Sequence, residues 1–214
     1  MTTTPDYGWS SPAPAGSHSY LEPVVLRVIS KTYTKIPLHN TPLKVFDAGC
    51  GNGALLVRLK AAGFEVAGCD ASEAGVAIAQ QTLGNAARLK HLSVYDDLAA
   101  SFGCDWDIVV ATEVVEHLYA PREFVKRARA LLKRGGILIL STPYHGYLKN
   151  LVLAATGAFD AHFTALWDGG HIKFWSYNTL TTLLKESQFE GFRFDGAGRL
   201  PWLWKSMVIS CHRD

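Results

Sequence analysis

The run LKVFDAGCGNG at residues 43–53 constrains this chain more than any other feature. Val45 and Phe46 are typical of a buried strand, and Asp47 closes that strand. The glycines that follow at every second position predict a turn in which a ligand can lie against bare backbone. Residues 54–62 then have the pattern of a helix. Strand, glycine turn and helix in this order are typical of a nucleotide-binding α/β fold.

The glycine turn fits two kinds of ligand. Gly49, Gly51 and Ala54 have the spacing of a dinucleotide loop, so the glycines alone leave a pyrophosphate open. Asp47 favours a different ligand, because a carboxylate just before the first glycine repels a pyrophosphate and suits the ammonium and sulfonium of S-adenosylmethionine. We therefore predict a methyl-donor site, and its loop comprises Gly49, Cys50, Gly51 and Gly53.

The composition indicates a soluble protein with one sizeable core. Of the 214 residues, 48% are hydrophobic and 19% are charged. A formal net charge of +2 with interspersed acids and bases does not favour nucleic acid as a partner. The scattered cysteines, without a CxxC pair, predict no structural zinc and fit a reducing cytosol. No run approaches the roughly 20 apolar residues of a membrane span. We expect a cytoplasmic protein.

The domain organisation follows from where polar, turn-forming residues gather. Residues 1–17 are rich in Thr, Ser, Pro and Gly, lack the pattern of a signal peptide, and predict a flexible N-terminal arm. Residues 18–214 are expected to form a single domain. Its segment 144–170 is a long, aromatic stretch where only a short connection is expected. Connections longer than about 12–15 residues are usually functional, so we predict a helical insert that covers a substrate.

Hydrophobic periodicity predicts alternating helices and strands. Helices are expected at 20–34, 54–62, 73–83 and 121–133, and strands at 44–47, 64–69, 92–95, 108–111 and 136–140. This alternation predicts a parallel sheet with helices on both faces. Segments 192–194 and 207–210 are separated by glycines and a proline, and they predict an antiparallel hairpin at the sheet edge. The expected class is α/β, a Rossmann-like and mostly parallel sheet of seven strands.

Acidic side chains follow the predicted strands at the edge where such sheets bind ligands. Asp70, followed by Ala71 and Ser72, can accept both ribose hydroxyls of the cofactor; its alternative role is a helix N-cap, for which Ser72 competes. Asp96 and Asp97 can hold adenine, or they are solvated turn acids. These residues extend the predicted cofactor site beyond the glycine loop.

The sequence Thr112-Glu113-Val114-Val115-Glu116-His117 after the fourth predicted strand is the second strong signal. Together with VFDAGCGNG, GCDAS, LKRGGILILSTP and GHIKFWS, it makes the chain resemble the class I S-adenosylmethionine-dependent methyltransferases, and among them the ubiquinone-biosynthesis O-methyltransferases. The likeness spans residues 43–189. It departs from those enzymes in its N-terminal lead-in and in the composition of the insert, which are the parts that face the substrate.

The resemblance implies roles for particular residues. It places Asp47 and the glycines at the methionine end of the cofactor and Asp70 at the ribose. Thr112, at the end of the fourth predicted strand, is a further candidate for binding the cofactor. Glu113, Glu116 and His117 match a motif implicated in divalent-metal binding in the ubiquinone branch. The same Glu-His pair occurs in metal-independent relatives, so a metal is an option rather than the favoured interpretation.

Methyl transfer also needs an acceptor site and a group that takes a proton. His171 is the preferred base, with His117 and Glu116 as further candidates, and His145 and His162 also lie in the half of the chain that faces the acceptor. The aromatic C-terminal half, with the insert and GRLPWLWK, fits an apolar or aromatic small-molecule acceptor and is a candidate surface for peripheral membrane contact.

The predicted reaction is methyl transfer to an oxygen of a small phenolic or lipid-like acceptor. The alternatives are N-methylation of a small amine or peptide, an NAD-dependent oxidoreductase that uses the same glycines, and a cofactor-binding subunit without turnover.

Overall fold

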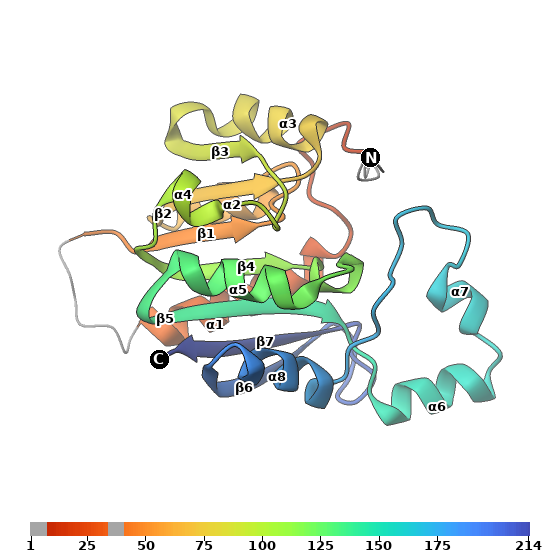
Figure 1. The fold of residues 1–214 in the computed structure, drawn as a ribbon. Coiled ribbons are helices and arrows are strands. Elements are labelled where there is room, and N and C mark those ends of the chain that lie inside the picture. Colours follow the sequence, from red (N-terminus) through yellow and green to blue (C-terminus); the bar gives the residue numbers. More distant parts are fainter. Residues whose placement is uncertain (1–7, 34–40) are drawn as a thin grey trace.

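Seven strands form one sheet at the centre of the molecule (Figure 1). The computed structural model describes residues 8–33 and 41–214. The strand order is β3-β2-β1-β4-β5-β7-β6. In chain order the strands are β1 (Lys44–Ala48), β2 (Glu65–Asp70), β3 (Ala87–His91), β4 (Trp106–Thr112), β5 (Leu132–Pro143), β6 (Phe189–Ala197) and β7 (Ser206–Arg213). The order reverses between β1 and β4, which is where sheets of this kind bind ligands.

The first five strands are parallel, whereas β7 runs antiparallel to both β5 and β6. The sheet is therefore the predicted Rossmann-like sheet with an antiparallel C-terminal hairpin. Alternate residues of each central strand enter different cores, as the pleat requires. Val45 packs with one buried cluster and Phe46 with the other, and Ile108 and Val109 are divided in the same way.

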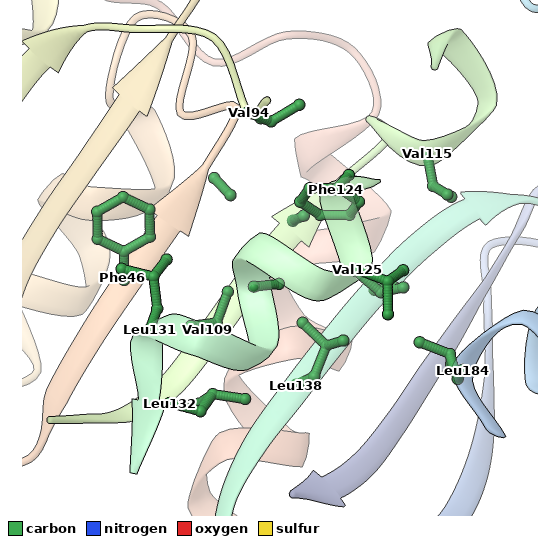
Figure 2. Packing of buried hydrophobic residues seen from close by; sticks show 14 of the residues in the cluster. Phe46, Val94, Val109, Val115, Phe124, Val125, Leu131, Leu132, Leu138 and Leu184 are labelled. Atoms are coloured by element: carbon green, nitrogen blue, oxygen red, sulfur yellow. The ribbon is translucent and has the colours of Figure 1, made fainter. Parts of the chain in front are cut away.

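Helices cover both faces of the sheet. They are α1 (His18–Tyr33), α2 (Ala54–Ala61), α3 (Glu73–Leu83), α4 (Leu98–Phe102), α5 (Pro121–Leu131), α6 (Tyr147–Ala155), α7 (Phe159–Phe163) and α8 (Tyr177–Glu186), with short 3₁₀ turns at Gly84–Ala86 and Val115–His117. Residues of α1, α2 and α3 pack in one cluster, and residues of α4, α5 and α8 pack in the other. Figure 2 shows Phe124, Val125 and Leu131 of α5 among the buried side chains that pack with Leu138 in the same cluster.

Most predicted elements lie where periodicity placed them, and one strand does not. The predicted strand at 92–95 is wrong, because the third strand is Ala87–His91. That strand lies at the sheet edge and buries only Leu89, so it lacks the apolar run of a central strand. Val94 belongs to a core cluster without being part of a strand, which explains the apolar pattern that suggested one.

The aromatic insert is helical, as predicted. Helices α6 and α7 lie beyond the carboxyl ends of β4 and β5, apart from the main layers (Figure 1). The loop from α7 to α8 returns to the sheet, where Ile172 N and Lys173 N both donate to Glu116 O, each at 2.9 Å. The fold thereby places the insert at the edge of the sheet that carries the predicted donor loop.

Candidate active site

The glycine loop is fixed by hydrogen bonds to the end of β2. The amides of Gly49 and Cys50 donate to Cys69 O at 2.8 and 3.0 Å, and the Gly51 amide donates to Asp70 Oδ2 at 2.7 Å. Gly49, Gly51 and Gly53 have φ of 87°, 51° and 78°, conformations that side chains disfavour. The sequence thus forms a tight turn directly beside the predicted ribose-binding acid.

Asp70 stands at the junction of the loop and α3. Its Oδ1 accepts from Ser72 N at 2.8 Å, while the Ser72 hydroxyl accepts from Gly75 N and caps α3. Ser72 is therefore the N-cap of α3, the Asp70 carboxylate accepts from the Ser72 and Gly51 amides, and its contact with the ribose stays a prediction. Burial raises the pKa of Asp70, and the bonds from Ser72 and Gly51 oppose that rise. The carbonyl oxygen of neighbouring Ala71 lies 3.0 Å from His91 Nε2, within hydrogen-bond distance.

Asp47 is the most unusual carboxyl group of the site. It is 1% exposed, and its Oδ1 has no hydrogen-bond partner among the described residues. Burial, and then the charge of Asp70, raise the pKa of Asp47 to about 8. A carboxylate in such surroundings is either protonated or paired with a cation. A positively charged ligand would satisfy this carboxyl group, and the cofactor contact of Asp47 stays a prediction.

A segment before α1 crosses the glycine loop, and composition did not predict this contact. The Asn52 side-chain amide donates to Ser11 O at 2.9 Å and to Ala13 O at 2.8 Å, and Asn52 is 1% exposed. The predicted mobility of residues 1–17 stays a prediction, and residues 1–7 lie outside the described part of the chain. Residues 8–17 of this arm therefore form one side, or wall, of the predicted donor site, against the glycine loop.

Trp9 forms the centre of that wall. A Cβ on Gly51 would lie 2.5 Å from Trp9 Cζ2, and one on Gly75 would lie 2.9 Å from Trp9 Cδ1. The indole is therefore in direct contact with both glycines, next to Asp70. A tryptophan in a Ser- and Pro-rich stretch is the signal that sequence reasoning missed, because composition alone suggested a solvated arm.

The segment after β4 packs directly on the donor loop. A Cβ on Gly49 would lie 2.5 Å from Val114 Cγ2, which places Glu113 and its neighbours beside the glycines. Glu113 Oε1 accepts from the Ser141 hydroxyl at 2.9 Å, and Oε2 accepts from the Ser206 hydroxyl at 3.3 Å. Burial raises the pKa of Glu113 to about 7, against these bonds. Thr112, at the end of β4, pairs with Ser141 of β5.

Glu116 is fully buried, and neither of its carboxylate oxygens has a partner among the described residues. Burial, and then the charge of Glu113, raise its pKa well above the ordinary range. Its ligand atoms lie within 4.8 Å of those of His117 and His171. Glu113 is not part of this group, whereas the sequence offered Glu113, Glu116 and His117 as the candidate ligands.

The two histidines meet because the loop before α8 is tied to the 3₁₀ turn at Val115–His117. His117 Nδ1 contacts Gly169 O at 2.9 Å and Gly170 O at 3.2 Å. Carbonyl oxygens only accept, so Nδ1 carries the proton of the neutral ring. The rings of His117 and His171 are 4.9 Å apart. Burial, and then His117, lower the pKa of His171 to about 4, so its imidazole is neutral at physiological pH.

An aromatic cavity lies next to this group, between the insert and the loop before α8. It has a volume of about 350 Å³ and is lined by His145, Asn150, Phe163, Phe174 and Ser176. His145 stacks on Phe163 and meets Phe174 edge-on. Its lining is mainly apolar with a few polar groups, as is typical of small-molecule sites.

Asp96 and Asp97 have local partners. Asp96 Oδ2 accepts from Ser93 N at 2.8 Å, and Asp97 Oδ1 accepts from Ala100 N at 3.1 Å and caps α4. Both residues are exposed. These bonds match the alternative role of turn acids, and contact with adenine stays a prediction for them.

Comparisons with known proteins agree with this geometry. Residues 18–192 match the family model described as a methyltransferase domain. The ubiquinone biosynthesis O-methyltransferase of Roseobacter denitrificans is 31% identical over 173 residues, covering 76% of this chain and 67% of that protein. The enzyme of the same name from Bradyrhizobium diazoefficiens is 36% identical over 120 residues, covering 54% of this chain and 46% of that protein. The chain thus spans about two thirds or less of these relatives.

Solved structures share the fold. The magnesium protoporphyrin IX methyltransferase of Synechocystis PCC 6803, solved with S-adenosylhomocysteine, has a TM-score of 0.67 at 24% identity, covering 91% of this chain and 84% of its own. The CMeT domain of the citrinin polyketide synthase has a TM-score of 0.70 at 14% identity, covering 90% of this chain and 52% of its own.

The chain belongs to the methyltransferase-domain family. It is an S-adenosylmethionine-dependent methyltransferase, which excludes the oxidoreductase alternative. Among the helices of the described residues, none is both long and apolar enough to span a membrane.

We predict that the contact between the N-terminal segment and the loop depends on Asn52. Asn52→Ala removes the donor of both bonds to Ser11 and Ala13, so amide hydrogen exchange should accelerate in residues 8–16. Thr82→Ala, on the exposed side of α3, is the control and should leave that exchange unchanged. Equal exchange in wild type and Asn52→Ala would contradict the role assigned to this side chain.

Proposed function

We propose that the chain transfers the methyl group of S-adenosylmethionine to an oxygen of a phenolic or lipid-like small molecule. The observation that supports binding of the methyl donor is the Asp47 carboxyl group, which is buried beside the glycine loop and whose Oδ1 has no hydrogen-bond partner among the described residues. The ammonium and sulfonium of the cofactor would supply positive charge there. The names of the relatives from Roseobacter and Bradyrhizobium support oxygen as the receiving atom.

The donor residues act by binding and orientation. In this proposal Asp47 faces the charged methionine end, the loop Gly49–Gly53 lies along it, and Asp70 accepts from the ribose hydroxyls. Asp70 is prepared for this because the Ser72 and Gly51 amides fix its carboxylate. Methyl transfer from a sulfonium is an in-line displacement, so alignment and exclusion of water provide most of the catalysis.

The acceptor residues complete the reaction. We place the acceptor in the aromatic cavity under the insert, with its hydroxyl near His171 and His117. His171 is the proposed base: its ring is neutral and takes the hydroxyl proton as the methyl group moves to oxygen. His117 and Glu116 orient His171 and the acceptor hydroxyl. N-methylation is the alternative, and an amine acceptor would be expected to approach the Glu116 carboxylate.

A divalent metal is the second way to satisfy Glu116. One carboxylate and two imidazoles from Glu116, His117 and His171 are a donor set that fits a transition metal better than magnesium. Such an ion would supply Lewis acidity to the acceptor oxygen. We favour the metal-free reaction, in which Glu116 is protonated and His171 takes the proton.

We also propose that the protein is cytoplasmic and contacts membranes peripherally. Leu148 and Leu151 of α6, and Leu200 and Trp202 of the β6–β7 connection, are 44%, 50%, 71% and 64% exposed. Apolar side chains at these exposures favour the interfacial region of a bilayer. Such contact would bring a lipid-like acceptor to the insert.

Binding of S-adenosylhomocysteine tests the donor site. Asp70→Ala removes two charge-assisted hydrogen bonds to the ribose, each worth roughly 1.5–3 kcal/mol, and should weaken binding about tenfold or more. Glu186→Ala removes a surface carboxylate on α8 and should leave the affinity unchanged. Calorimetry that gives both variants the wild-type Kd would refute the assignment of Asp70.

Turnover with a catechol acceptor, measured with and without chelator, separates a base from a metal ligand at His171. His171→Ala should lower kcat while the Kd of S-adenosylhomocysteine stays within about twofold, because His171 is not among the residues proposed to bind the cofactor. Wild-type turnover should persist in excess chelator. Loss of wild-type turnover that added metal restores would instead make His171 a ligand, and normal turnover by His171→Ala would exclude both roles.

A further inference from the structure

A second cavity lies on another face of α6, between that helix and the β6–β7 connection. Its volume is about 350 Å³, and it is lined by Lys149, Val152, Leu153, Arg199, Leu200 and Leu203. Lys149, Val152 and Leu153 share one face of α6 because they are spaced three and four residues apart. None of these residues lines the aromatic cavity described above.

Among the residues that line the cavity, Lys149 and Arg199 carry positive charge and none carries a carboxylate. Lys149 is 5% exposed, and its ammonium donates to the Lys205 carbonyl oxygen at 3.4 Å. Among the ion pairs of residues 8–33 and 41–214, none involves Lys149 or Arg199. Burial, and then Arg199, lower the pKa of Lys149 to about 8. A buried ammonium next to a guanidinium is costly unless an anion joins them.

The cavity also adjoins the reaction centre. The Lys149 ammonium donates to Lys205 O at 3.4 Å, and the next residue, Ser206, donates its hydroxyl to Glu113 Oε2 at 3.3 Å. Glu113 belongs to the segment that packs on the donor loop. Glu113 does not fully neutralise the positive charge of the site, because burial raises the pKa of Glu113 to about 7 and its carboxyl group is only partly ionised near neutral pH. A ligand anchored at Lys149 would therefore lie beside the residues that carry out the reaction.

We propose that this cavity binds the anionic group, a carboxylate or a phosphate, of an amphiphilic acceptor molecule. Lys149 and Arg199 hold the anion, and Val152, Leu153, Leu200 and Leu203 contact the adjoining apolar part. The inference rests on the proposed function, since it names the acceptor class of the same site. The occupant is a single amphiphile rather than a bilayer, because the ammonium of Lys149 lies inside a recess and not on the exposed surface.

Calorimetry with decyl phosphate and 1-decanol tests the subsite on the full chain. Lys149→Met keeps the apolar stem and removes the charge, so it should weaken decyl phosphate binding about tenfold or more and leave decanol binding unchanged. Lys149→Arg keeps the charge and should retain most of the affinity. Lys185→Met, on the surface of α8, is the matched control and should behave as wild type.

The proposal would be overturned if wild type and Lys149→Met bound decyl phosphate with equal affinity, or if wild type did not prefer decyl phosphate to decanol. It would also be overturned if the protein bound phosphatidylglycerol vesicles in a Lys149-dependent way but did not bind monomeric decyl phosphate. If Lys149→Met does not fold, Arg199→Met, at an exposed position, provides the same comparison. Binding of S-adenosylhomocysteine is measured in parallel, so a failed donor site is distinguished from a failed anion subsite.

Discussion

The proposed chemistry depends on a buried carboxyl group, Asp47, whose Oδ1 has no hydrogen-bond partner among the described residues. Asp47 lies in the central strand β1, between β2 and β4, and is 1% exposed. An acid in that position destabilises the empty protein as pH rises from its unfolded pKa towards about 8, because only the protonated form is tolerated. In the proposed function a cationic cofactor offsets this cost, so the residue that lowers stability in the empty protein would provide affinity and selectivity.

The same principle recurs a few residues from the donor loop. Glu116 is also buried, its oxygens have no well-formed hydrogen bond among the described residues, and its neighbours include Thr142, Glu113 and the imidazoles of His117 and His171. Val114 joins the two places, since it packs on Gly49 while its neighbours form the 3₁₀ turn that holds the histidines. The glycine loop and the turn that carries Glu116 and His117 are thus parts of one packed edge. In the proposed function this packing would provide the alignment that methyl transfer needs.

Features of sequence that depend on neighbours along the chain were predictable, and features that depend on distant partners were not. The strand-loop-helix unit around Asp47, the hairpin and the helical insert follow from local patterns. The edge strand β3 does not, because one buried Leu89 gives no period. The contact of Trp9 with Gly51 joins residues 42 positions apart, which no local pattern encodes. The same holds for His171, which lies 55 positions from Glu116 and takes the place that the sequence offered to Glu113 in the candidate metal group.

Proton release on cofactor binding tests the central role of Asp47 most directly. At about pH 6.5 the Asp47 carboxyl is protonated in the empty protein, and an ammonium held beside it lowers its pKa, so binding should release about one proton per S-adenosylhomocysteine. Calorimetry in buffers of different ionisation enthalpy counts that proton. The account predicts that Asp47→Asn abolishes the release and weakens binding. The same proton count and affinity in wild type and Asp47→Asn would contradict it.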